Sequence, residues 1–149
     1  MGGSEDGEEA SPEMMTDPDA AAEFVKLTGV DMLAISIGNC HGLYKKPPKL
    51  DVERLKIIME KVDIPIVLHG DLDLPIDMSL EVIKEGIVKF NVGTDLKYAF
   101  SRKLKELLNI EPMPFQPPQV LGPAREALCE VARQKIKLFG SNGKASLYR

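Results

Sequence analysis

Short runs of mostly apolar residues mark three segments of the chain. Residues 64–68 are Ile-Pro-Ile-Val-Leu and lead directly into His69. Residues 32–37 form a similar run, which His41 follows, and residues 87–92 form the third. Such a run, bounded by turn residues, predicts a strand that is buried on both faces. We therefore expect three buried strands.

The stretches between and around these runs carry apolar residues on one helical face. In residues 51–61, Leu55, Ile58 and Met59 recur at helical spacing and are expected to face the sheet. Asp51 stands at the start of this stretch as its expected N-cap. Helices are expected over residues 16–28, 51–61, 77–85, 96–108 and 123–138.

Two of these helices have further end signals. Thr16 or Asp17 would cap the first helix, and Gly29 would end it. Thr94 or Asp95 would cap the fourth helix. A polar turn rich in backbone N–H groups at a helix start can bind an anion.

The order of the elements predicts an α/β fold, because a helix follows each expected strand. The carboxyl ends of parallel strands lie at one edge of the sheet, where ligands bind in such folds. His41 and His69 both follow strands, so both are candidates for a site at this edge. Three strands are too few to close a barrel and leave two unpaired edges.

The segments outside these elements are polar or rich in proline. Residues 1–15 are expected to be a flexible acidic lead. Residues 109–118 contain four prolines and are expected to be a linker. Residues 141–149 are expected to be a flexible tail, which leaves residues 16–140 as the folded part.

Composition narrows the classes of partner. The chain has 149 residues, which suits one domain, and it is 44% hydrophobic but only 5% aromatic, which suits an aliphatic α/β core. Its net charge of −4, with scattered Lys and Arg, argues against binding nucleic acid or an anionic membrane. Cys40 and Cys129 are too few for a disulfide framework, and no apolar run reaches the length of a membrane span. We expect a cytoplasmic protein with free thiols.

Several motifs occur in a fixed order along the chain. They are Thr28-Gly29-Val30-Asp31, Ile37-Gly38-Asn39-Cys40-His41-Gly42-Leu43-Tyr44, Val67-Leu68-His69-Gly70, Asn91-Val92-Gly93-Thr94-Asp95-Leu96, Leu121-Gly122-Pro123-Ala124-Arg125-Glu126-Ala127 and Leu138-Phe139-Gly140-Ser141-Asn142-Gly143-Lys144-Ala145. These motifs resemble those of the class II, metal-dependent ketose-bisphosphate aldolases, which act on fructose or tagatose bisphosphate. The resemblance runs from Gly2 to Lys144.

The resemblance implies a TIM (β/α)8 barrel, in which the three expected strands resemble strands six to eight. A full barrel needs about 250 residues. We therefore expect an α/β fold that is the C-terminal part of such a barrel.

The resemblance also implies a zinc site and a substrate site. His41 and His69 match two of the family's three histidine ligands, and neutral imidazoles suit Zn²⁺. The metal would act as a Lewis acid on the ketone. Phosphorylated ketose or dihydroxyacetone phosphate would contact residues on the loops after the strands, as in other TIM barrels. The implied substrate contacts are Gly42, Lys45, Gly70, Asn91, Val92, Gly93 and Thr94.

Two departures from the family pattern change the expected function. The chain has only two histidines, and it has no equivalent of the family's early-strand catalytic aspartate. After His69-Gly70 the family usually has a small residue, Ser and Gly, where this chain has Asp71-Leu72-Asp73. Each carboxylate beside a phosphate would be repelled by about 1–3 kcal/mol at an effective dielectric of ~20. We expect an aldolase-like lyase of carbohydrate metabolism, such as glycolysis, that is inactive as this isolated chain. The alternative is a non-catalytic barrel fragment that self-associates, forms a homo-oligomer or pairs with a separate N-terminal half.

Several candidate residues have a second interpretation that the sequence leaves open. Cys40 beside His41 could form a Cys–His pair or be a packed thiol. Asp71 and Asp73 could be metal ligands or a solvated pair. Lys45, with the lysine after it, could bind phosphate or belong to a basic loop.

Overall fold

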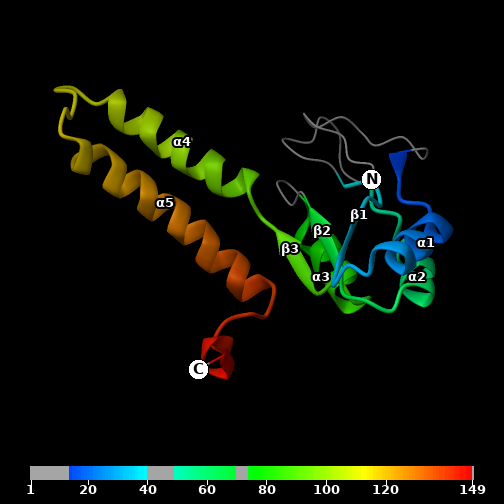
Figure 1. Ribbon diagram of the computed structural model, residues 1–149. Helices are drawn as coiled ribbons and strands as arrows, with labels where there is room; N and C mark the ends of the chain where they lie inside the picture. Colours follow the sequence, from blue (N-terminus) through cyan, green and yellow to red (C-terminus); the bar gives the residue numbers. More distant parts are fainter. Residues whose placement is uncertain (1–13, 40–48, 70–73, 149) are drawn as a thin grey trace. The chain divides into compact units, whose positions relative to one another are not determined.

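The computed structural model describes residues 14–39, 49–69 and 74–148 (Figure 1). It divides into two compact units, Met1–Thr94 and Asp95–Arg149. The elements are α1 (Pro18–Thr28), β1 (Leu33–Ile35), α2 (Val52–Lys61), β2 (Ile66–His69), α3 (Ile76–Lys84), β3 (Lys89–Asn91), α4 (Thr94–Leu108), α5 (Pro117–Leu138) and a 3-10 helix (Lys144–Tyr148).

The first unit is built on a parallel sheet in the order β1-β2-β3. Leu33 lies opposite Ile66, and His69 lies opposite Asn91. Helices α1 and α2 pack against each other in the same unit (Figure 1). The predicted α/β class and parallel strands are confirmed.

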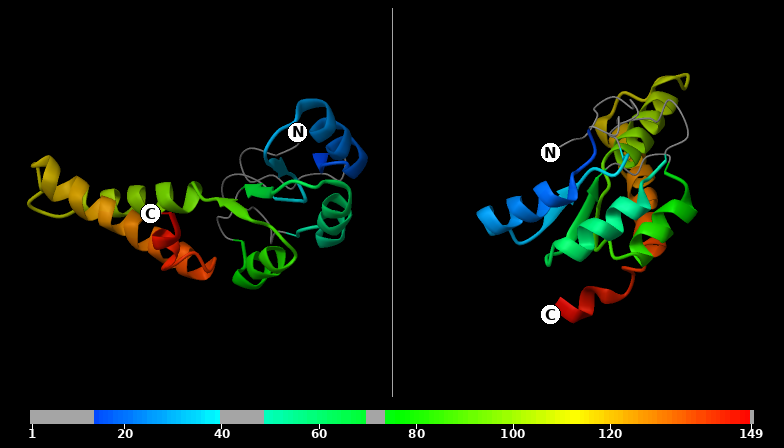
Figure 2. Two further views of the ribbon diagram at one scale, coloured as in Figure 1. Left: turned by 60° about the horizontal axis from the view of Figure 1, so that its bottom comes forward. Right: turned by 90° about the vertical axis from the view of Figure 1, so that its right-hand side faces the viewer.

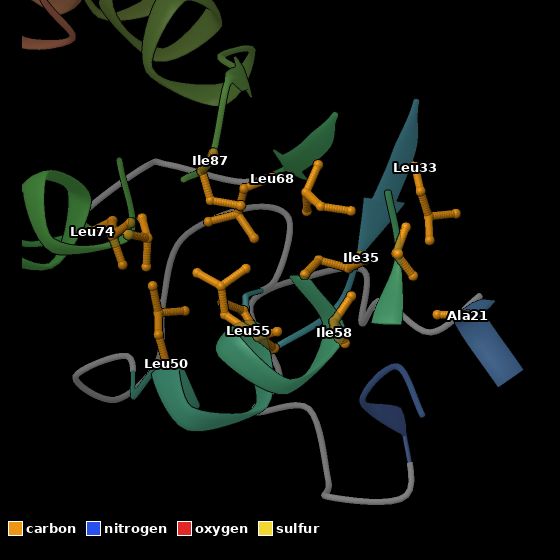
Figure 3. Packing of buried hydrophobic residues seen from close by; sticks show 13 residues of the cluster. Ala21, Leu33, Ile35, Leu50, Leu55, Ile58, Leu68, Leu74 and Ile87 are labelled. Carbon is orange, nitrogen blue, oxygen red and sulfur yellow. The ribbon is translucent and has the colours of Figure 1, made fainter. Parts of the chain in front are cut away.

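One face of this sheet forms the hydrophobic core. Ile35 and Leu68 point from the strands toward Leu55 and Ile58 of α2 (Figure 3), and Val82 of α3 joins the same cluster. Leu55 and Ile58 are fully buried, as the helical spacing predicts, and Met59 packs against the cluster. Since side chains alternate across a strand, the residues between the core positions lie on the opposite face. This second face carries Ala34, Ser36, Val67, His69, Lys89 and Asn91.

Of the three described strands, only β2 is buried on both faces, and the prediction of a strand buried on both faces is wrong for β1, where Ala34 is exposed. Ile66, Val67 and Leu68 of β2 are at most 2% exposed, as predicted. The prediction of a buried third strand is wrong, because Lys89 is exposed and Val88 is 66% exposed. Within the part of the chain that the structure describes, β2 is the one strand beside β3, so the residues of β3 receive less cover than those of β2.

The predicted caps of α1 and α2 are confirmed. The Asp17 side chain accepts hydrogen bonds from the backbone N–H groups of Asp19 and Ala20 at 3.0 and 2.9 Å. Asp51 accepts from Arg54 N at 3.0 Å. Gly29 ends α1 in the left-handed conformation, with φ of 64°, which glycine adopts at little cost.

The predicted starts of α4 and α5 are wrong. Helix α4 begins at Thr94, so Asp95 lies in its first turn and not before it. Helix α5 begins at Pro117, six residues before the predicted start at Pro123. Proline is favoured in the first turn of a helix because its missing N–H has no partner to lose there, so part of the predicted linker is helical. The expected tail contains the 3-10 helix.

Helices α4 and α5 run antiparallel, side by side (Figures 1 and 2). Asp95 at the start of α4 forms an ion pair with Lys135 near the end of α5 at 2.6 Å, and the two side chains are 13% and 19% exposed. This ion pair links the start of α4 to the end of α5, opposite the loop that joins the two helices. None of the described helices combines the length and apolar composition needed to cross a membrane.

Candidate functional site

The polar residues of the second face gather at the carboxyl end of the sheet. His69 is the last residue of β2, and it lies opposite Asn91, the last residue of β3. Ser36 directly follows β1, whose last residue, Ile35, lies opposite Leu68, the residue before His69. Three strands thus supply one polar row at the edge where ligands bind in parallel folds.

Contacts between side chains join part of this row. Asn91 Nδ2 lies 2.8 Å from His69 Nε2. Lys89 Nζ donates to Asn91 Oδ1 at 2.5 Å. His69 and Asn91 are half-buried, whereas Lys89 is exposed. The Lys89 ammonium therefore contacts the Asn91 amide on β3, and this amide contacts the His69 imidazole on β2.

Asn39 fixes the backbone around His69. Its Oδ1 accepts from Ile37 N at 2.8 Å, and its Nδ2 donates to His69 O at 3.0 Å. Its side chain thus links the segment after β1 to the end of β2, and Asn39 is only 4% exposed. Gly38 makes the preceding turn with φ of 100°, and a Cβ there would lie 2.5 Å from Lys49 O. Glycine is required at this position.

Ser36 has an unusual environment in the polar row. Its backbone N–H donates to Thr16 Oγ1 and its carbonyl accepts from Thr16 N, both at 2.8 Å. Its own hydroxyl is buried, and among the described residues it is the one buried side-chain polar atom without a hydrogen-bond partner. A buried hydroxyl normally has a partner, so Ser36 Oγ is suited to receive a ligand or water.

The structure brings together only some of the predicted site residues. His69 and Asn91 are in contact; Val92 and Gly93 lie between β3 and α4, Thr94 is the first residue of α4, and all three are half-buried. A Cβ built on Gly93 would have nothing within 4 Å, so the backbone there can be approached closely. Four predicted residues and the altered loop lie outside the described residues, namely His41, Gly42, Lys45, Gly70 and Asp71-Leu72-Asp73.

Three residues of the site, Lys89, Asn39 and Ser36, were not among those predicted. Lys89 could have been found from strand periodicity, since it stands two residues before Asn91 and so shares its face. Asn39 belongs to the motif that begins at Ile37, and Ser36 lies in the apolar run before it, but neither pattern assigns these two residues partners. Within the described ranges, no three His, Cys, Asp or Glu side chains gather into a metal cluster.

Two ion pairs on helices and a hollow at the start of α2 lie outside the polar row. Hydrogen bonding and charge from Glu53 raise the pKa of Lys56 on α2, and Glu126 raises the pKa of Arg133 on α5 in the same way. Both pairs stand on exposed helix surfaces. A hollow of about 540 Å³ opens at the start of α2, lined by Met15 and residues 49–54, and none of the polar row lines it.

The chain is similar to known class II aldolases. Residues 1–144 match the family model of class II fructose-bisphosphate aldolases. The YdjI aldolase from Escherichia coli K12 is 42% identical, with a TM-score of 0.79 over 89% of this chain and 48% of that one. A candidate fructose-1,6-biphosphate aldolase from Coccidioides immitis is 28% identical, with a TM-score of 0.80 over 90% of this chain and 46% of that one.

A third structure supports the fold alone. Fructose-bisphosphate aldolase from Campylobacter jejuni is 21% identical, with a TM-score of 0.64 over 86% of this chain and 45% of that one. This chain spans about half the length of each of the three solved chains. Its parallel strands and helices are a part of the aldolase TIM-barrel fold. The chain belongs to the class II fructose-bisphosphate aldolase family.

Proposed function

We propose that this chain forms one side of the active site of a class II ketose-bisphosphate aldolase. The reaction would be the reversible aldol cleavage of fructose or tagatose bisphosphate to dihydroxyacetone phosphate and an aldehyde. The observation that carries the proposal is the 2.8 Å contact between His69 and Asn91 at the carboxyl edge of the sheet, in a chain of this family.

His41 and His69 are the proposed zinc ligands. A metal-binding histidine usually has a polar partner on its other ring nitrogen, and Asn91 provides one at His69 Nε2. The Asn91 side chain would suit a zinc ligand once its oxygen, rather than its Nδ2, faces His69 Nε2, and a metal ion would then bind through Nδ1. Zinc held there would supply Lewis-acid polarisation of the substrate carbonyl.

Residues of the chain itself would orient the phosphorylated substrate. The Asn91 amide would hold a substrate oxygen, and the backbone of Gly93 is open to close approach. The N–H groups of Gly93 and Thr94, with the Thr94 hydroxyl, would donate to a phosphate or hydroxyl of the substrate. By family resemblance, Gly42, Lys45 and Gly70 would bind phosphate.

The loop at Asp71-Leu72-Asp73 would weaken that phosphate binding. A hydroxyl donor is replaced by Leu72, and two carboxylates are added beside a dianion. Losing one charge-assisted hydrogen bond and adding two repulsions should cost roughly 3–6 kcal/mol. That cost corresponds to roughly two to four powers of ten in kcat/KM.

A non-catalytic fragment is the second candidate function. The exposed Val88 and Lys89 favour it, because β2 is the one strand that neighbours β3 among the described residues, and an edge strand can pair with another chain. The chain has only two histidines, so it lacks the family's third ligand. On this alternative, it would act by self-association or by pairing with a separate N-terminal half.

The deciding experiment compares the chain alone with a hybrid that adds the N-terminal half of a complete family member. We expect no zinc-dependent turnover of either ketose bisphosphate by the chain alone. The hybrid should bind zinc but turn over substrate well only after Asp71-Leu72-Asp73 is changed to Gly-Ser-Gly. The hybrid that carries His69→Ala is the inactive control.

Three results would count against these proposals. Turnover by the chain alone that His69→Ala abolished would refute the expected inactivity. Equal kcat/KM of both loop versions at the same zinc loading would show that the loop keeps its phosphate function. A cooperative, folded monomer in sedimentation would argue against self-association.

A further inference from the structure

The contact between Lys89 and Asn91 determines which way the Asn91 amide faces. A lysine ammonium has three donors and no acceptor, so only the amide oxygen can face it. Lys89 Nζ lies 2.5 Å from Asn91 Oδ1, in agreement with this requirement. The other end of the same amide, Nδ2, is then the group at 2.8 Å from His69 Nε2.

This orientation in turn determines the tautomer of His69. The amide Nδ2 is a donor only, so the ring nitrogen that it faces must offer a lone pair. His69 Nε2 is therefore the acceptor, and the proton of the neutral imidazole lies on Nδ1. In histidine, the hydrogen bond at one nitrogen sets the state of the other.

We propose that Lys89 is a positioning residue that acts through Asn91 to hold His69 in the tautomer that cannot bind a metal ion. The lone pair of His69 Nε2 accepts a hydrogen bond from Asn91 Nδ2. Nδ1 carries the proton, and a metal ion binds only a nitrogen with an available lone pair. The part of the proposal that concerns metal rests on the proposed function, in which His69 is a zinc ligand.

Binding of a metal ion at Nδ1 would require a coupled rearrangement. The proton moves from Nδ1 to Nε2, so the ring neither gains nor loses a proton overall. The Asn91 amide turns by half a turn so that Oδ1 accepts from Nε2–H. Its Nδ2 would then face the Lys89 ammonium, two donors in contact, so Lys89 must leave. Lys89 is exposed and can move into solvent.

Removal of Lys89 should therefore change the tautomer of His69 without any metal. Two-bond ¹H–¹⁵N spectra of the full chain report which ring nitrogen carries the proton, and His69→Gln assigns the two histidines. We expect Nδ1–H in the unmodified chain and a shift toward Nε2–H in Lys89→Met. Lys89→Arg should keep Nδ1–H because guanidinium is also a donor only. Lys84→Met, an exposed change on α3, is the matched control and should leave the tautomer unchanged.

A titration with Zn²⁺, followed through the same ring signals, tests the consequence for metal. Lys89→Met should reach half-saturation at about tenfold lower zinc, since a charge-assisted hydrogen bond no longer has to break. An Nε2–H tautomer in the unmodified chain, or no tautomer shift in Lys89→Met, would overturn the proposal. A tautomer shift with unchanged zinc affinity would overturn its metal part. If no variant responds to zinc, the zinc assignment in the proposed function fails, while the spectra still decide the role of Lys89.

Discussion

The two faces of the three-stranded sheet differ in what their residues do. On the core face, Ile35 and Leu68 are packed among apolar side chains of the helices. On the second face, His69, Lys89 and Asn91 are joined by polar contacts. Neighbouring residues of one strand thus belong separately to the hydrophobic core and to the polar row. The difference predicts that substitutions on the two faces will change different measured quantities.

The largest effect on stability is expected from the core face. Leu68 is fully buried, so Leu68→Ala should lower the free energy of unfolding by about 2–5 kcal/mol through lost burial and a residual cavity. Denaturant unfolding followed by circular dichroism measures this change. Ala34→Ser, at an exposed position of the second face, is the matched control and should be nearly neutral. Equal losses from both variants would contradict the division between the faces.

A smaller loss in the free energy of unfolding is expected from a change at Asn39. Its side chain bonds to the backbone just after β1 and at the end of β2. Asn39→Ala leaves Ile37 N and His69 O without their partner, and an unsatisfied buried group costs about 1–3 kcal/mol. The same unfolding experiment measures it, with Asn109→Ala at an exposed position as the control. A neutral Asn39→Ala would mean that these two hydrogen bonds do not hold the site in place.

Much of the core face could be predicted from the sequence, and little of the second face could. The unbroken run before His69 identified β2, because a strand that is buried on both faces needs apolar residues at every position. Asp17 and Asp51 identified helix starts by local capping chemistry. The contact between Asn91 and His69 depends on the register between β2 and β3, which no local pattern encodes. The start of α5 was missed since Pro117 and its neighbouring proline suit both a linker and a first helical turn.

The smallest change in the free energy of unfolding is expected at Ser36, and it should be a gain rather than a loss. Ser36→Ala removes a buried hydroxyl without a partner, so it should raise the free energy of unfolding by about 1 kcal/mol. In the hybrid barrel that carries Gly-Ser-Gly at residues 71–73, the same change should lower substrate affinity if Ser36 Oγ receives a ligand. KM from steady-state kinetics measures that loss. A destabilising Ser36→Ala would show that the hydroxyl has a structural partner.

The most direct test of the division between faces compares two adjacent residues of β3 in that same hybrid. Asn91 lies on the second face, while Phe90 packs against the core cluster. Asn91→Ala should lower kcat/KM by about a hundredfold and leave unfolding nearly unchanged. Phe90→Ala should lower the free energy of unfolding by about 3 kcal/mol and leave kcat/KM of the folded protein nearly unchanged. If Asn91→Ala lost stability and kept its kcat/KM, the second face would not be part of an aldolase site.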